Sequence, residues 1–133
     1  MRIAYMTTDE VNQSLAAKMA AECGADICAR LPLDPLPDGQ FHAVLYDLDS
    51  SQKHRCGEIV ALILSSPLTC PRAVHGYDIT DEQAEALRQH GVAVGQRLRA
   101  GLIRSLCKAA RPSRATVPPD DERTERTWVN VVK

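Results

Sequence analysis

A short run near the middle of the chain most constrains the fold, because it has the pattern of a buried strand that ends in acids. Residues 44–46 are apolar, as in the middle of a parallel sheet, and Asp47 and Asp49 follow directly. In open α/β sheets, the carboxyl ends of the strands face the ligand-binding crevice. The sequence therefore predicts that Asp47 lies in a functional crevice rather than on an ordinary surface.

Strand patterns and helix patterns alternate along residues 1–111. Strands are expected over residues 2–6, 26–31, 41–48, 72–77 and 92–95. Helical spacing of apolar residues falls between them, within residues 11–23, 56–64, 80–91 and 102–110. This alternation is typical of a parallel sheet with helices on both faces. We expect a flavodoxin-like, doubly wound five-stranded parallel sheet with strand order 2-1-3-4-5.

Two helix starts carry capping signals. Thr7 and Glu10 have the spacing of a capping box, and so do Thr80 and Gln83. In the first helix, apolar residues recur every four positions, which predicts one buried face. The residues of that face are Val11, Leu15, Met19 and Cys23.

The segment between the second and third strands contains three prolines, Pro32, Pro35 and Pro37. Proline lacks a backbone donor and disfavours the helical region for the residue before it, so a regular helix is excluded here. We expect a proline-rich loop in place of the helix that would normally follow the second strand.

Length and composition indicate a single domain followed by a tail. The chain has 133 residues, of which 44% are hydrophobic, and a net charge of −1. This balance predicts neither direct nucleic-acid binding nor membrane binding, and no apolar run is long enough to span a membrane. The five cysteines form no CxxC pair, so we expect reduced thiols. Residues 2–6 have a strand pattern in place of a signal peptide, so we expect a cytoplasmic protein. Residues 112–133, which include Trp128, are expected to form a flexible tail or linker.

The segment Ala43–Asp49 is similar to the strand that carries the phospho-acceptor aspartate in receiver domains of bacterial response regulators. The resemblance covers residues 1–111 and includes the passage 89–94. It implies that Asp47 is the phospho-acceptor and that the backbone carbonyl of Asp49 contacts Mg²⁺.

The chain departs from the receiver pattern around this aspartate. Thr7 and Thr8 occupy the positions of the two acids that hold Mg²⁺ in the family, and Asp9 matches only with a shift of one residue. Gly76 is nearest to the expected Thr or Ser, and Arg97 is the best match to the expected Lys.

These departures predict a degenerate receiver, or pseudo-receiver. The pocket is expected to comprise Thr7, Thr8, Asp9, Gly76 and Arg97. Asp9, Asp47 and Asp49 are expected to bind Mg²⁺ weakly or not at all, because Mg²⁺ relies on carboxylates that are missing here. No other cofactor is expected.

The function predicted from this resemblance is signal transduction through protein contacts, with weak or no phosphorylation and no enzymatic activity. The expected partners are a histidine kinase, an effector or a second copy of the chain, with a possible homodimer through residues 81–111. The candidate interface residues are Glu82, Glu85, Arg88, Arg97, Arg99 and Arg104.

Two other functions remain open at this point. One is a true receiver that is phosphorylated on Asp47 with Mg²⁺, and the other is a flavodoxin-like enzyme or small-ligand-binding protein. Asp47 is also open to a purely structural role, for example paired with Arg97. For His75 we expect a packed histidine rather than a general base, because no nucleophile motif accompanies it.

Overall fold

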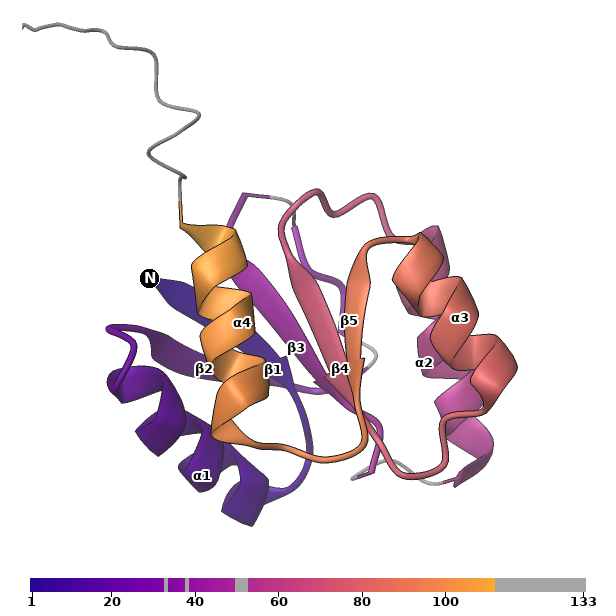
Figure 1. Ribbon diagram of the computed structural model, residues 1–133, viewed down its shortest axis with the longest axis horizontal. Helices are drawn as coiled ribbons and strands as arrows, with labels where there is room; N and C mark the ends of the chain where they lie inside the picture. The colour runs from indigo at the N-terminus through magenta and orange to yellow at the C-terminus, as the bar shows by residue number, and fades with distance from the viewer. Residues whose placement is uncertain (33, 38, 50–52, 112–133) are drawn as a thin grey trace, which may run out of the picture.

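The computed structural model describes residues 1–32, 34–37, 39–49 and 53–111, which form a parallel sheet with helices on both faces (Figure 1). The strands are β1 (Arg2–Met6), β2 (Asp26–Arg30), β3 (Ala43–Asp47), β4 (Arg72–His75) and β5 (Val92–Gly95). The helices are α1 (Glu10–Ala21), α2 (Lys53–Ser65), α3 (Asp81–Gln89) and α4 (Ala100–Ala110). The strand order is β2-β1-β3-β4-β5, which confirms the predicted flavodoxin-like topology.

Strand β3 lies in the middle of the sheet, and each of its residues is buried. Its register places Tyr46 beside Met6 of β1 and Asp47 beside His75 of β4. Because all neighbouring strands are parallel, the carboxyl ends of β1, β3 and β4 meet at one edge of the sheet. This edge is where the polar residues after the strands come together.

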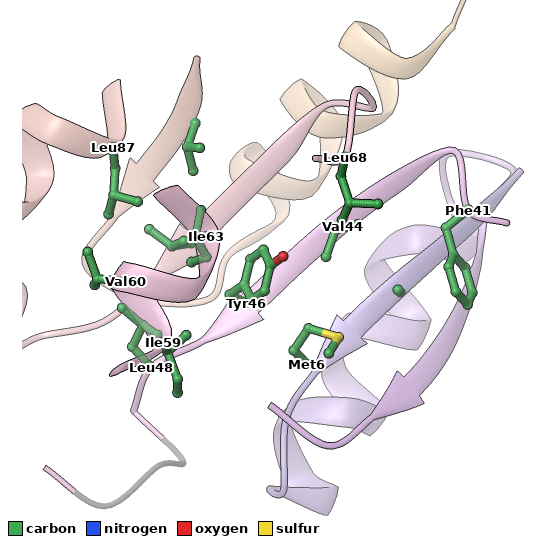
Figure 2. Close-up of a cluster of buried hydrophobic side chains, with 13 residues drawn as sticks. Met6, Phe41, Val44, Tyr46, Leu48, Ile59, Val60, Ile63, Leu68 and Leu87 are labelled. Atoms are coloured by element: carbon green, nitrogen blue, oxygen red, sulfur yellow. The ribbon is translucent and has the colours of Figure 1, made fainter. Parts of the chain in front are cut away.

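The two faces of the sheet bury separate clusters of side chains, because alternate residues of a strand point to opposite faces. Met6 and Tyr46 pack with Ile63 of α2 in the cluster drawn in Figure 2. Tyr5 and Leu45 belong to the other cluster, which α1 and α4 cover. The interior of the sheet is therefore apolar on both sides, as its near-continuous hydrophobic strands predicted.

The described residues contain no helix between β2 and β3, as the prolines predicted. The link ends at Phe41, which is buried. The guanidinium groups of Arg2 and Arg30 lie 4.9 Å and 5.4 Å from the centre of the Phe41 ring. These cation–π contacts fasten the end of the link to β1 and β2.

The start of α1 differs from the prediction, whereas the start of α3 agrees with it. The N-cap of α1 is Asp9, whose carboxylate accepts two first-turn N–H groups, so the capping box predicted for Thr7 and Glu10 is wrong. Aspartate is a strong N-cap, and the Thr7 hydroxyl donates to another residue. In α3 the capping box of Thr80 and Gln83 is present.

The buried face of α1 also differs from the prediction. Val11 and Leu15 are 68% and 43% exposed, whereas Ala16 and Ala20 are fully buried. The four-residue spacing had predicted that the larger apolar residues form the buried face. Met19 and Cys23 of the predicted face do pack against the core, so the prediction is wrong for Val11 and Leu15 alone. Alanine at positions 16 and 20 lets the helix backbone lie close to the sheet.

The predicted tail, residues 112–133, and Trp128 within it lie outside the described residues, so its character stays a prediction. No helix of the described ranges is long and apolar enough to cross a membrane. No disulfide joins the five cysteines, of which Cys107 is buried and the other four are half-buried.

We predict that Ala16→Leu lowers the free energy of unfolding by about 1–3 kcal/mol, because the added methyl groups have no space beside the sheet. The matched control is Val11→Ala, which changes an exposed side chain and should alter stability by less than about 0.5 kcal/mol. Urea denaturation followed by circular dichroism measures both. A larger loss for Val11→Ala than for Ala16→Leu would mean that the predicted apolar face is the buried one.

Candidate functional site

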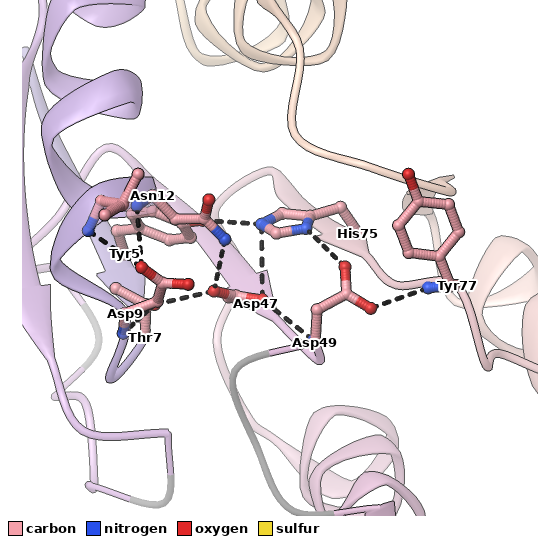
Figure 3. Close-up of polar contacts among 9 residues, drawn as sticks. Tyr5, Thr7, Asp9, Asn12, Asp47, Asp49, His75 and Tyr77 are labelled. Carbon is pink, nitrogen blue, oxygen red and sulfur yellow. Dashed lines mark hydrogen bonds and ion pairs between the residues drawn. The ribbon is translucent and has the colours of Figure 1, made fainter.

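The centre of the site is Asp47, the last residue of β3, whose side chain is fully buried. Beside it lies His75, the last residue of β4, which is 1% exposed. Thr7 follows β1 on the other side and is also buried. Three adjacent strands thus bring polar side chains to one point at the carboxyl edge of the sheet (Figure 3).

Both carboxylate oxygens of Asp47 accept hydrogen bonds. The Oδ2 atom accepts from the hydroxyl of Thr7 at 2.8 Å and from the side-chain amide of Asn12 at 3.1 Å. The Oδ1 atom accepts from the backbone N–H of Asp49 at 2.9 Å. A buried carboxylate needs such donors, because an ion removed from water without partners costs several kcal/mol. The protein itself therefore satisfies Asp47.

The loop from β1 to α1 supports Asp47 through Thr7. The hydroxyl oxygen of Thr7 accepts from the backbone N–H of Asp9 at 3.0 Å while the hydroxyl donates to Asp47. The carboxylate of Asp9 is engaged as the N-cap of α1, and Thr8 is exposed. Of these predicted pocket residues, Thr7 bonds directly to Asp47.

A buried tyrosine connects His75 to Asp47. The hydroxyl of Tyr5 lies 2.7 Å from Nε2 of His75 and also hydrogen-bonds to Asp47. We assign the hydroxyl proton to Asp47, because a carboxylate accepts, and this assignment makes Nε2–H of His75 the donor to the hydroxyl oxygen. Burial, with the negative charges of Asp47, Asp9 and Asp49, raises the pKa of Tyr5 far above its usual value. Tyr5 therefore remains a protonated donor.

Asp49 lies on the other side of the His75 ring. Its Oδ1 atom accepts from the backbone N–H of Tyr77 at 2.9 Å, and its Oδ2 atom lies 3.5 Å from Nδ1 of His75. This Nδ1 atom is buried and has no hydrogen-bond partner. The Nε2 atom lies 3.8 Å from Oδ1 of Asp47. The imidazole is thus located between two carboxylates (Figure 3), and its Nδ1 atom is within ion-pair distance of Asp49 but makes no hydrogen bond.

A cavity of about 300 Å³ opens onto this group. Its lining residues are Asn12, Leu15, Asp49, His75, Tyr77, Arg97 and Leu98. The structure thus places Arg97, the predicted pocket cation, in the same cavity as Asp49 and His75.

Gly76, which was also predicted to line the pocket, instead lines a second cavity of about 120 Å³ with Asp81 and Arg88. A Cβ atom on Gly76 would lie only 3.0 Å from Cβ of Leu48 and 3.2 Å from the Ile79 side chain. The glycine is therefore explained by close packing.

Sequence reasoning missed the site roles of Tyr5, Asn12 and His75. Asn12 lies three residues after the N-cap of α1, in the first turn of the helix. From there its side-chain amide reaches Asp47 at the end of β3. His75, rather than Gly76, is the residue in register with Asp47. The expectation that His75 is a packed histidine is confirmed, but its position between two carboxylates depends on the pairing of β3 with β4.

We predict that Tyr5→Phe destabilises the fold by about 1–3 kcal/mol, because it leaves the buried Nε2–H of His75 without its acceptor. Tyr77→Phe is the matched control: the Tyr77 side chain is 65% exposed, and the bond to Asp49 comes from its backbone. The control should change stability by less than about 0.5 kcal/mol. Thermal and urea unfolding measure both variants, and equal losses would contradict the hydrogen-bond chain.

No protein-family model and no curated protein sequence matches the chain. Among solved structures, it is similar to a CheY-like response regulator from Mesorhizobium loti. The two structures superpose with a TM-score of 0.52 at 15% sequence identity, over 83% of this chain and 98% of the other. At this identity the likeness shows the fold, and the chain therefore has the flavodoxin-like fold of a CheY-like receiver.

Proposed function

We propose that this chain is a receiver-like signal-transduction domain that acts through protein contacts, with little or no phosphorylation of Asp47. The state of Asp47 is the observation that carries the proposal. Its side chain is 0% exposed, and both oxygens already accept hydrogen bonds. A carboxylate that attacks a phosphoryl group has to present a lone pair in line with the donor. Asp47 is poorly arranged for that attack.

The residues do not fit the Mg²⁺ that the receiver resemblance implies. Mg²⁺ demands near-octahedral oxygen ligands and usually keeps several waters. The carboxylate of Asp9 caps α1, the hydroxyl of Thr7 donates to Asp47, and the imidazole of His75 lies between Asp47 and Asp49. The pocket thus offers a nitrogen where Mg²⁺ prefers oxygen, and the proposed function uses no Mg²⁺-dependent step.

The proposed contact surface comprises residues 81–111, which include α3, β5 and α4. The candidate interface residues on it are all exposed, and they are Glu82, Glu85, Arg88, Arg97, Arg99 and Arg104. Mixed charge of this kind suits a polar partner with a complementary pattern, because charge pairs across an interface favour specificity and association rate. The proposed partner is a histidine kinase, an effector or a second copy of this chain.

We predict that acetyl phosphate with MgCl₂ produces at most a trace phosphoryl adduct on the chain, because the acceptor oxygens are buried and engaged. Intact-mass spectrometry over a time course measures the adduct directly. An established phospho-accepting receiver, treated in parallel, shows that the donor is active.

Asp47→Asn is the matched control for the site of attack. A stoichiometric adduct on the wild-type chain that is absent from Asp47→Asn would contradict the proposal and make this a working phosphorylation switch. An adduct present on both chains would come from another residue and would leave the assignment of Asp47 unchanged.

A further inference from the structure

We infer that His75 and Asp49, next to the buried carboxylate of Asp47, form a site for a borderline divalent transition metal such as Zn²⁺, with preference over Mg²⁺. One potential ligand atom from each residue lies within 4.8 Å of the other two. The inference does not depend on the signalling role proposed above, because it rests on the geometry and chemistry of these three side chains.

The unpaired nitrogen of His75 points to a missing ligand. The Nδ1 atom is buried, makes no hydrogen bond and lies 3.5 Å from Oδ2 of Asp49. Buried polar atoms are nearly always paired, so an unpaired one requires an explanation. Two ligand atoms that are each about 2.1 Å from a tetrahedral metal lie roughly 3.4 Å apart. The spacing of Nδ1 and Oδ2 is therefore close to that of two ligands of one metal.

The neighbours of His75 prepare the ring for this role. Its Nε2–H donates to the hydroxyl of Tyr5, which in turn donates to Asp47. Metal-binding histidines nearly always donate their other ring N–H in this way, which fixes the tautomer and orients the ring. The lone pair of Nδ1 is thereby directed toward Asp49, with no need for the ring to turn.

Charge and access agree with a metal at this position. Two carboxylates, Asp47 and Asp49, lie beside the imidazole, and a divalent cation would balance their charge. The adjoining cavity of about 300 Å³ provides an entry path and room for a water or an anion as a further ligand. Arg97 lines the same cavity and favours an anion there.

The combination of imidazole nitrogen and carboxylate oxygen ligands indicates which class of metal the site would bind. Imidazole nitrogen suits Zn²⁺, Cu²⁺, Ni²⁺ and Fe²⁺, whereas carboxylates and water alone suit Mg²⁺. Zn²⁺ is the most practical probe, because it has no redox chemistry and accepts tetrahedral nitrogen and oxygen ligands.

We predict that isothermal titration calorimetry detects one Zn²⁺ site per full-length chain and at least tenfold weaker binding of Mg²⁺. His75→Gln and Asp49→Asn should each weaken Zn²⁺ binding at least tenfold, because each removes a ligand. His90→Gln is the matched control, since His90 is an exposed histidine on another part of the fold, and it should bind Zn²⁺ like the wild type.

Circular dichroism checks the fold of each variant. If His75→Gln does not fold, the Zn²⁺ affinity of Asp49→Asn tests the inference by itself. The Asp49 side chain is 30% exposed and tolerates substitution better than the buried His75. Full Zn²⁺ affinity in a folded His75→Gln or Asp49→Asn variant would overturn the inference and assign the ion to the free thiols. Mg²⁺ binding as tight as Zn²⁺ binding would also overturn it. A chain that neither binds Zn²⁺ nor accepts a phosphoryl group would refute this site and leave the proposed function standing.

Discussion

The burial of one carboxylate governs the carboxyl edge of the sheet. Asp47 ends the central strand at 0% exposure, so its charge has to be satisfied by the protein. Thr7, Asn12 and the N–H of Asp49 supply the donors, each from a different element or loop. These bonds join the β1–α1 loop and the first turn of α1 to β3. The same bonds withdraw Asp47 from the solvent, where a phosphoryl donor would have to reach it.

The position of His75 follows from the same constraint. A side chain in register with Asp47 on β4 has to be compatible with a buried anion, and an imidazole N–H that reaches the anion through Tyr5 meets that requirement. This arrangement directs the other ring nitrogen toward Asp49, where it has no hydrogen-bond partner. The burial of Asp47 thus explains both the hydrogen bonds around its carboxylate and the position of the His75 nitrogen on which the proposed metal site depends.

The fold was largely predictable, because apolar periodicity and the prolines determine strands, helices and the missing helix. The N-cap of α1 was not predictable, because Thr7 and Asp9 are both good N-cap residues. Thr7 donates its hydroxyl to Asp47 instead, and Asp9 caps the helix. Asp47 and Thr7 were placed correctly from the strand ends. The role of His75 was missed, because it depends on the register between β3 and β4, which hydrophobic pattern does not specify to a single residue.

The most direct test of this account is a long-range ¹H–¹⁵N correlation spectrum of the His75 ring in the metal-free chain at mildly alkaline pH, assigned with His75→Gln. The chain of hydrogen bonds from His75 through Tyr5 to Asp47 predicts a protonated Nε2 and an unprotonated Nδ1. A protonated Nδ1, in either the other neutral tautomer or the imidazolium, would contradict the account. The ring would then donate to Asp49, and no unpaired nitrogen would remain to bind a metal.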